Sequence, residues 1–162
     1  LQIVFDAIKS ASGAHHFLSV TKEGNSAIFS TSGNSYCHTI LRGGSKKVNY
    51  DEKSIDEVSA RLDKANLPQQ IVVDCSHANS MKDHKKQMIV VDDLAKQLSN
   101  GEKRIKGLMI ESNLVEGNQN INDENLVYGK SVTDACIGWE DTQKVLYTLS
   151  EAIEKRKNNA QN

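Results

Sequence analysis

With 162 residues, the chain is long enough for a single domain whose core would bury roughly two thirds of the surface of the unfolded chain. Its 20 basic and 21 acidic residues give a formal net charge of −1 with interleaved signs, which argues against nucleic acid as a partner, because a phosphate backbone needs a basic stripe. No apolar run approaches the roughly 18 residues of a membrane span and residues 1–5 have no basic leader region, so we expect no membrane partner and a cytoplasmic protein.

The first part of the chain predicts one helix and two strands. Apolar residues recur at helical spacing over residues 1–12, and Gly13 is a natural end for that helix. The apolar run 16–21 has the length of a strand, whereas residues 23–35 are small and polar and indicate a short helix or a turn. A second strand is expected over residues 37–41.

The middle of the chain continues with a helix, a strand and another helix. Asp51 begins a helix with one apolar face, and Pro68 closes the turn after it because proline cannot extend a helix. The β-branched run 71–73 is a third strand. Helical spacing then resumes over residues 84–99.

The last part predicts a fourth strand over residues 105–110, a long loop and an amphipathic helix over residues 142–153. Residues 157–162 are rich in asparagine and are expected to fray. The chain opens on an apolar segment without an initiator methionine, which we interpret as a piece of a longer protein.

Four strands that alternate with helices predict an α/β fold with parallel pairing, because parallel neighbours need connections of helical size. A closed TIM (β/α)₈ barrel has eight strands and about 250 residues. We therefore expect four βα units, half of such a barrel, over residues 1–156. An open doubly wound sheet is the alternative, although the sequence contains neither G-x-G-x-x-G nor G-x-x-x-x-G-K-[ST], which mark nucleotide sites on such sheets.

Polar or charged residues follow each predicted strand at its carboxyl end. They are, in chain order, Thr21 with Lys22, Arg42, the run Asp74 to His77, and Glu111. In barrels of this kind the carboxyl ends of the strands carry the active site, so we expect four strands to point these groups into one bowl.

The triplet Arg42-Gly43-Gly44 is suited to an anion. A guanidinium is a planar fork of donors, and two glycines would let backbone amides approach phosphate oxygens. The alternative is a plain turn in which Arg42 pairs with a surface carboxylate.

Three residues form a candidate metal-binding set. His77, Glu111 and Asp134 offer one imidazole and two carboxylates, a mixed set that suits Mn²⁺, Fe²⁺ or Co²⁺ and does not exclude Zn²⁺. The alternatives are a hydrogen-bonded histidine at a strand end for His77, a solvated carboxylate for Glu111 and a turn cap for Asp134. The three cysteines are far apart and form no C-x-x-C pair, so we expect reduced, structural thiols.

Five stretches of the sequence, in order along the chain, point to one family. They are residues 19–27 (S-V-T-K to S-A), 40–44 (I-L-R-G-G), 74–88 (D-C-S-H-A-N-S with K-K-Q-M), 111–119 (E-S-N-L-V-E-G-N-Q) and 128–139 (Y-G-K-S-V-T-D-A-C-I-G-W). Together they resemble class I 3-deoxy-D-arabino-heptulosonate-7-phosphate (DAHP) synthases. The resemblance runs from the first helix to residue 156 and corresponds to the carboxy-terminal half of that family.

This resemblance implies a metal-dependent enzyme that condenses phosphoenolpyruvate with erythrose 4-phosphate and releases inorganic phosphate, the first step of the shikimate pathway to aromatic amino acids. It implies His77, Glu111 and Asp134 as the metal ligands. It also implies His77 and Arg42 as catalytic residues, with Arg42 and Asp134 in contact with substrate.

The resemblance further implies an aromatic amino acid as a feedback effector. Phe17, Ser19 and Phe29 fall where sensitive members of the family build part of the effector pocket. For Phe17 and Phe29 the alternative is ordinary core packing.

The chain also departs from the family pattern. Asn113, Cys75 and Val48 stand where the pattern has a histidine, an aromatic residue and a proline. The family's cysteine metal ligand, its catalytic lysine in a G-F-K-N-G segment, its K-P-R-T segment and a second phosphate-binding arginine have no counterpart in this sequence.

We therefore expect this chain to be inactive alone. A parallel sheet cut at this point exposes apolar edges, so self-association or pairing with the missing half is expected. Two other functions stay open. One is a non-catalytic half-barrel that serves as a regulatory or assembly module, and the other is an unrelated metal-dependent aldolase.

Overall fold

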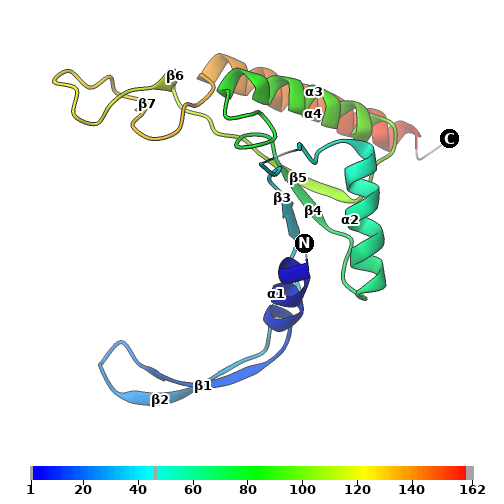
Figure 1. Ribbon diagram of the computed structural model, residues 1–162, viewed down its shortest axis with the longest axis vertical. Helices are drawn as coiled ribbons and strands as arrows, with labels where there is room; N and C mark the ends of the chain where they lie inside the picture. Colours follow the sequence, from blue (N-terminus) through cyan, green and yellow to red (C-terminus); the bar gives the residue numbers. More distant parts are fainter. Residues whose placement is uncertain (1, 46, 160–162) are drawn as a thin grey trace.

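A computed structural model of the chain describes residues 2–45 and 47–159. At its centre is a three-stranded sheet with helices around it, and two thin extensions project from this centre, the β1–β2 hairpin and the segment that carries β6 and β7 (Figure 1). The helices are α1 (Gln2–Ser12), α2 (Glu52–Lys64), α3 (Gln87–Ser99) and α4 (Trp139–Asn159), and α3 follows a 3₁₀ turn, η1 (His84–Lys86). The strands are β1 (His15–Val20), β2 (Ser26–Thr31), β3 (Thr39–Leu41), β4 (Ile71–Asp74), β5 (Ile105–Met109), β6 (Val115–Asn118) and β7 (Lys130–Ser131).

The central sheet is parallel and has the strand order β3-β4-β5. The connection from β3 to β4 contains α2 and that from β4 to β5 contains α3, as parallel pairing requires. β4 lies in the middle, and its β-branched residues Ile71 and Val73 are fully buried. The carboxyl ends of the three strands, at Leu41, Asp74 and Met109, lie along one edge of the sheet.

Helix α2 forms where the sequence predicts it and for the expected reasons. The side chain of Asp51 accepts hydrogen bonds from the backbone N–H of Ser54 at 3.0 Å and from its hydroxyl at 2.8 Å, which caps the helix. Ile55 and Leu62, two turns apart on the same face of the helix, are fully buried. Phe5 of α1 joins the same hydrophobic core.

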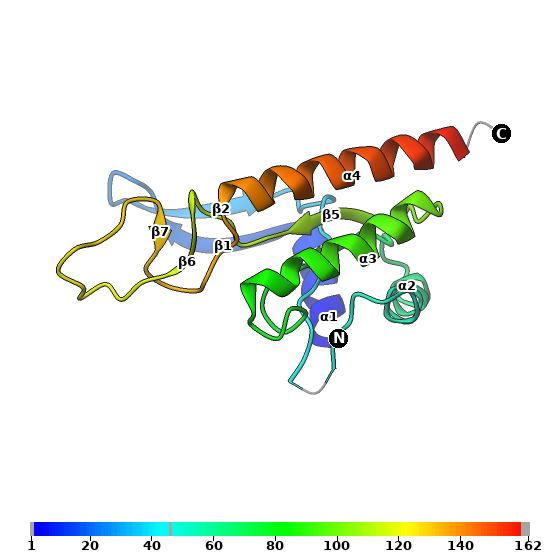
Figure 2. The same ribbon diagram turned by 90° about the horizontal axis from the view of Figure 1, so that it is seen from above.

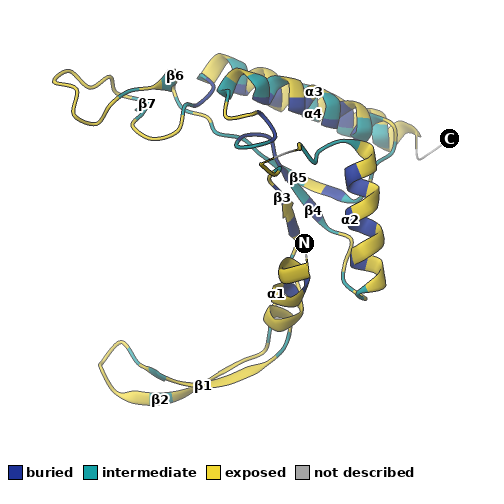
Figure 3. Cartoon of the chain, in the orientation of Figure 1, coloured by how far each residue is buried: buried dark blue, intermediate teal, exposed yellow. Residues whose placement is uncertain are grey.

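Helices α3 and α4 lie side by side along much of their length in both views (Figures 1 and 2). Leu94 and Leu98 of α3 and Val145 and Ala152 of α4 belong to the same buried cluster as the β4 side chains. Burial is concentrated in this part of the molecule, whereas the two extensions are largely exposed (Figure 3). The core therefore lies between the parallel sheet and the helices that connect its strands.

The first predicted strand does not join the parallel sheet, which corrects the expectation of four parallel βα units. β1 pairs antiparallel with β2, and β2 occupies residues 26–31, where a short helix or turn was expected. Residues 21–25, which join the two strands, are too few for a parallel crossover. They form a hairpin turn in which Gly24 has a φ of +84° and Thr21 donates its N–H to the carbonyl oxygen of Asn25. The described residues thus form a mixed α/β fold with three βα units, the third being β5 with α4.

The last helix is longer than the sequence predicts. α4 begins at Trp139 and continues through Asn159, so residues 157–159 are helical, while residues 160–162 of the expected frayed tail lie outside the described residues. Two side chains hold the end of α4 in place: Arg156 donates to the carbonyl oxygen of Glu102 at 2.8 Å and Asn159 donates to that of Ser99 at 3.1 Å. No helix in the described ranges combines the length and apolar character needed to cross a membrane.

Candidate metal centre

The candidate site begins where β4 ends, at the central position of the sheet edge. His77 lies three residues beyond Asp74 and has a φ of +39°, an unusual conformation for a residue other than glycine. The backbone here is held by Asn79, whose side-chain amide donates to the carbonyl oxygens of Asp74 at 2.9 Å and Leu41 at 3.1 Å. This turn therefore directs the His77 ring toward the loops that follow β5.

The structure brings the three predicted metal ligands together. One ligand atom each from His77, Glu111 and Asp134 lie within 4.8 Å of one another. His77 Nε2 is 3.5 Å from Glu111 Oε1 and 3.9 Å from Asp134 Oδ2. The side chains of His77 and Glu111 are about one fifth exposed, whereas that of Asp134 is 74% exposed. The sequence prediction that these residues converge is consistent with this geometry.

The arrangement fits a cation because of the atoms that face one another. Asp74 Oδ2 lies 2.7 Å from His77 Nδ1, and because an ionised carboxylate can only accept, a hydrogen bond between these atoms requires the proton on Nδ1. In a neutral ring Nε2 then presents a lone pair toward the two carboxylates. Three electron-pair donors that face one another are stabilised by a divalent metal ion, and an imidazole with two carboxylates suits a transition metal.

Glu111 is fixed by its neighbours on both its backbone and its side chain. The Gln87 side chain accepts from the Glu111 N–H at 2.8 Å and donates to its carbonyl oxygen at 3.1 Å. The Ser76 hydroxyl donates to Glu111 Oε2 at 2.5 Å, which leaves Oε1 on the side of His77. Ser76 and Gln87 were not predicted as supports of Glu111. The sequence indicates them by position alone, since Ser76 lies next to His77 and Gln87 begins a buried helix.

Arg42 lies beside this site rather than in it. Its Nε atom is 3.8 Å from Asp74 Oδ2, and its side chain is 63% exposed. The prediction that glycine amides would be free for phosphate is wrong, because Gly43 donates its N–H to Asn49 Oδ1 at 2.7 Å and Gly44 donates to the carbonyl oxygen of Lys47. The guanidinium is therefore the available anion donor of this triplet.

The glycine at position 43 is required for a different reason. Its φ is +77°, and a Cβ atom there would lie 2.8 Å from the backbone nitrogen of Asn79. Gly43 thus lets the turn after β3 approach the turn after β4. This approach brings Arg42 to the side of Asp74.

The remaining candidates lie elsewhere. Phe17, Ser19 and Phe29 are on the β1–β2 hairpin, where the two phenylalanine rings stack with centroids 6.0 Å apart. Phe17 is 48% and Phe29 37% exposed, so neither is packed in the core of the described chain. Thr21 and Lys22 form part of the hairpin turn, so they do not join the carboxyl edge of the central sheet as predicted.

A cavity of about 230 Å³ contains the three ligands and adds Lys82 and His84 to its wall. Cys136 is also close to these residues. Burial is the main cause that raises the pKa of its thiol, which disfavours the thiolate form that binds metals. No cysteine of the described ranges belongs to the ligand group. Burial, with a smaller contribution from Asp74, raises the pKa of Cys75 to about 12, so this thiol stays protonated at neutral pH. The donor set is therefore nitrogen and oxygen only.

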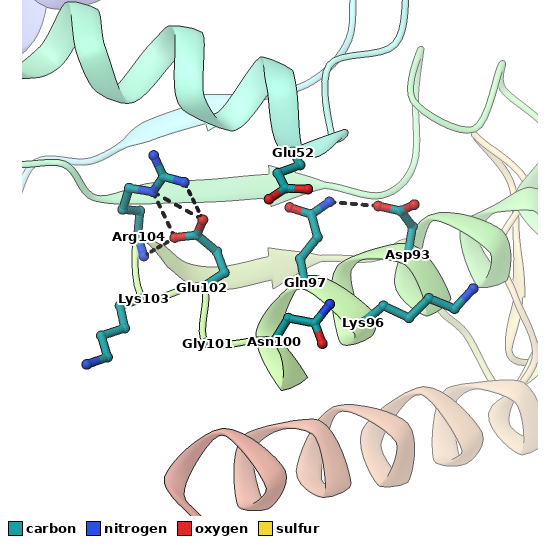
Figure 4. Close-up of a pocket in the computed structure, with 9 residues that line it drawn as sticks. All are labelled: Glu52, Asp93, Lys96, Gln97, Asn100, Gly101, Glu102, Lys103 and Arg104. Atoms are coloured by element: carbon teal, nitrogen blue, oxygen red, sulfur yellow. Dashed lines mark hydrogen bonds and ion pairs between the residues drawn. The ribbon is translucent and has the colours of Figure 1, made fainter. Parts of the chain in front are cut away.

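A larger cavity of about 550 Å³ lies between α2, α3 and the start of β5 (Figure 4). It is lined by charged side chains, but its arginine is already neutralised. Arg104 pairs with Glu102 at 2.5 Å and with Asp56 at 2.7 Å. The hydrogen bonding of the Arg104 side chain to Glu102 is the main cause that lowers the pKa of Glu102. The Arg104 charge is thus used within the protein, and the cavity is separate from the candidate metal centre.

Comparison with known proteins gives one consistent result. The sequence model of the "DAHP synthetase I family" matches residues 1–147. The chain is 54% identical over 158 residues to "Phospho-2-dehydro-3-deoxyheptonate aldolase, Phe-sensitive" of Escherichia coli (strain K12), a match that covers 97% of this chain and 45% of that protein. It is 47% identical over 157 residues to the "Trp-sensitive" protein of that name from Enterobacter agglomerans, with 96% and 45% covered.

A solved structure agrees with these matches. The phospho-2-dehydro-3-deoxyheptonate aldolase from Francisella tularensis SCHU S4 superimposes with a TM-score of 0.90 at 49% identity, over 96% of this chain and 45% of that one. The chain spans about half the length of the relatives that it matches.

Proposed function

The chain belongs to the DAHP synthetase I family, and from this we propose that it carries the metal centre of an enzyme that condenses phosphoenolpyruvate with erythrose 4-phosphate and releases inorganic phosphate. In that enzyme the parallel sheet β3-β4-β5 is part of a TIM barrel, to which the described residues contribute three βα units. The cytoplasm is the proposed location, as for a biosynthetic enzyme that uses phosphorylated metabolites.

The observation that carries this proposal is the convergence of three side chains from separate parts of the chain. His77 follows β4, Glu111 follows β5 and Asp134 follows β7, yet their ligand atoms lie within 4.8 Å of one another. The sites of barrel enzymes lie at this end of the strands. A single histidine or carboxylate at the end of a strand would not have supported a metal centre.

Each residue has a distinct proposed role. His77, Glu111 and Asp134 would hold the divalent ion, which would supply Lewis acidity for the aldehyde oxygen of erythrose 4-phosphate. The Arg42 guanidinium, mostly exposed beside Asp74, binds the phosphate of phosphoenolpyruvate through charge-assisted hydrogen bonds. Asp134, the most exposed of the three ligands, also faces substrate. The donor set leaves Mn²⁺, Fe²⁺, Co²⁺ and Zn²⁺ as candidates.

We also propose an aromatic amino acid as effector, bound at the β1–β2 hairpin. The relatives above are named for sensitivity to different amino acids, phenylalanine and tryptophan. The stacked and partly exposed rings of Phe17 and Phe29 offer an aromatic surface beside Ser19, and exposed aromatic rings suit an aromatic ligand. The identity of the amino acid is left open between phenylalanine, tyrosine and tryptophan.

The activity is tested by phosphate release from both substrates with Mn²⁺. The chain is assayed alone and after mixing with the complementary segment of the Escherichia coli relative. We expect no turnover alone, because the cysteine ligand and the catalytic lysine segment of the family have no counterpart here, and turnover on mixing. Glu111→Gln removes a ligand charge and should lower the rate of the mixture at least about 100-fold. The control Glu154→Gln, at an exposed position of α4, should leave the rate unchanged.

Two results would contradict the proposal. One is full activity of the lone chain, and the other is a mixture whose rate does not depend on Glu111. A chain that binds phenylalanine or tyrosine but shows no metal-dependent activity in any mixture would instead support a regulatory or assembly module, which the exposed aromatic hairpin makes the second candidate. Membership of the family excludes an unrelated aldolase.

A further inference from the structure

Asp74 occupies a position at the centre of the site without being one of the predicted ligands. It is the last residue of the middle strand of the sheet, and only 2% of its side chain is exposed. Oδ1 accepts the N–H of Ser76 at 2.9 Å, and Oδ2 lies 2.7 Å from His77 Nδ1. The carboxylate therefore reaches the metal ligand from behind, on the side away from Glu111 and Asp134.

This contact determines which nitrogen of His77 can bind a metal. A neutral imidazole carries one proton, and the atom without it is the only one that can donate an electron pair. With the proton on Nδ1, Nε2 is free, and Nε2 is the atom that faces Glu111 and Asp134 at 3.5 and 3.9 Å. With the proton on Nε2, an N–H would point at the carboxylates and occupy the metal position.

The contact is also rigid on the side of Asp74. The Asp74 backbone carbonyl accepts from Asn79 Nδ2, and its N–H and carbonyl belong to the middle strand of the parallel sheet. His77, in contrast, is held in a left-handed conformation that costs roughly 1–2 kcal/mol for an ordinary residue. A carboxylate in a fixed position thus faces the ring of His77, a residue whose backbone conformation is unfavourable without stabilising contacts.

We propose that Asp74 is the positioning residue of the metal centre: it keeps the proton of His77 on Nδ1 and directs Nε2 toward Glu111 and Asp134. This inference rests on the proposed metal centre and names the group that prepares it. Carboxylates behind histidine ligands raise ligand basicity and fix ring orientation, and their loss costs about 10- to 100-fold in metal affinity.

Because Arg42 also lies beside Asp74, the variant Asp74→Asn can be used to compare an effect on metal binding with an effect on phosphate binding. Arg42 Nε is 3.8 Å from the same Oδ2 atom, but the Arg42 side chain is mostly exposed, so this ion pair contributes little. Removal of the Asp74 charge should therefore weaken Mn²⁺ binding strongly and change the affinity for inorganic phosphate less than about fivefold. A merely structural role for Asp74 would weaken both together.

The first test uses the unaltered full chain and needs no variant. Its histidine rings are labelled with ¹⁵N, and NMR spectra are recorded without metal at a pH where imidazoles are neutral. The His77 signals are identified by their loss in His77→Gln. We expect the proton on Nδ1 and an unprotonated Nε2, and a ring with its proton on Nε2 would overturn the inference.

The second test compares the Mn²⁺ affinities of the full chain, Asp74→Asn and Asp83→Asn, measured by calorimetric titration. Asn keeps the shape of Asp but removes its charge, so Asp74→Asn should bind Mn²⁺ about 10- to 100-fold more weakly. Asp83→Asn is the matched control, because Asp83 lies in the same loop but accepts from Lys85 N–H rather than from His77. Equal affinities of Asp74→Asn and the unaltered chain would contradict the positioning role.

The outcomes separate this inference from the proposed function. If the unaltered chain binds no Mn²⁺ although its His77 tautomer is as expected, the proposed metal centre fails and the ring contact stands. If the chain binds Mn²⁺ and Asp74→Asn binds it equally well, the metal centre stands and the positioning role fails. Should Asp74→Asn not fold, the tautomer of the unaltered chain decides alone.

Discussion

Asp74 at the end of β4 and the three residues that follow it have four different roles. Asp74 is buried and accepts from the ring of His77, while Cys75 is fully buried in the core. Ser76 donates to Glu111, and His77 faces the cavity. Alternation along a strand explains the opposite directions of the first two, and the positive φ of His77 explains the last. Such a run is typical of the end of a parallel strand that carries a site.

Asn79 is buried, and its side chain satisfies three backbone groups. It donates to the carbonyl oxygens of Leu41 and Asp74 and accepts from the N–H of Asn49. Asn79→Ala leaves these groups unpaired, and we expect it to lower the free energy of unfolding by about 2–4 kcal/mol, measured in urea. Asn118→Ala removes an amide with one exposed contact and should cost less than about 1 kcal/mol. An equal decrease in the free energy of unfolding for the two variants would show that the buried Asn79 hydrogen bonds stabilise the fold no more than the exposed contact of Asn118.

Particular side chains determine where α2 begins and hold the end of α4 in place. α2 begins at the Asp51 cap, and α4 is held at its far end by Arg156 and Asn159. The first limit was readable from the sequence, because a cap and the helix it begins are adjacent. The second was not, since the carbonyl acceptors of Ser99 and Glu102 lie far away in the chain.

The stabilisation that the Asp51 cap gives to α2 is expected to depend on pH. Burial acts to raise the pKa of Asp51, but hydrogen bonds from the side chain and backbone of Ser54 outweigh it, and the net pKa is lowered. A lowered pKa means that the ionised cap stabilises the fold above the ordinary pKa of about 3.9, and that this contribution is lost as the pH falls below it. Asp51→Ala should therefore cost about 1 kcal/mol at pH 7 and progressively less in acid.

Urea unfolding of Asp51→Ala and the unaltered chain at several pH values measures this difference. Glu57→Ala, at an exposed position within α2, is the control and should change the free energy of unfolding by less than about 0.5 kcal/mol. A gap between Asp51→Ala and the unaltered chain that stays constant into acid would contradict the capping explanation.

At the scale of the whole molecule, the described residues leave much apolar surface uncovered. β3 and β5 each pair with β4 alone among the strands of the described sheet, and Ile40 of β3 is 55% exposed. On the hairpin, Leu18 and Ile28 are cross-strand neighbours and are 75% and 77% exposed. Open sheet edges and apolar patches of this kind favour association with another chain.

We therefore predict that the chain associates. Light scattering after size exclusion should give a molar mass above 17.9 kDa that rises with concentration. Charges at the hairpin, introduced as Leu18→Lys with Ile28→Lys, should shift the mass toward that of the monomer. Ile89→Lys, at an exposed position of α3, is the control and should leave the mass unchanged. A monomer at every concentration would contradict the prediction.

The sequence alone determined what depends on neighbours in the chain. The helix over residues 1–12, the capped helix after Asp51 and the strands of the parallel sheet follow from spacing and caps. The three ligand candidates followed from their place after strands and from family resemblance, and the structure places His77, Glu111 and Asp134 together.

Tertiary structure decided what depends on residues far apart in the chain. The pairing of β1 with β2 is one case, because a strand-length apolar run does not specify its partner or its direction. The role of Asp74 is another, since its spacing from His77 does not reveal whether its side chain faces the core or the ring. Local spacing sets the period of a segment, but the partner of each hydrogen bond is set only when the chain folds and distant groups come within reach of one another.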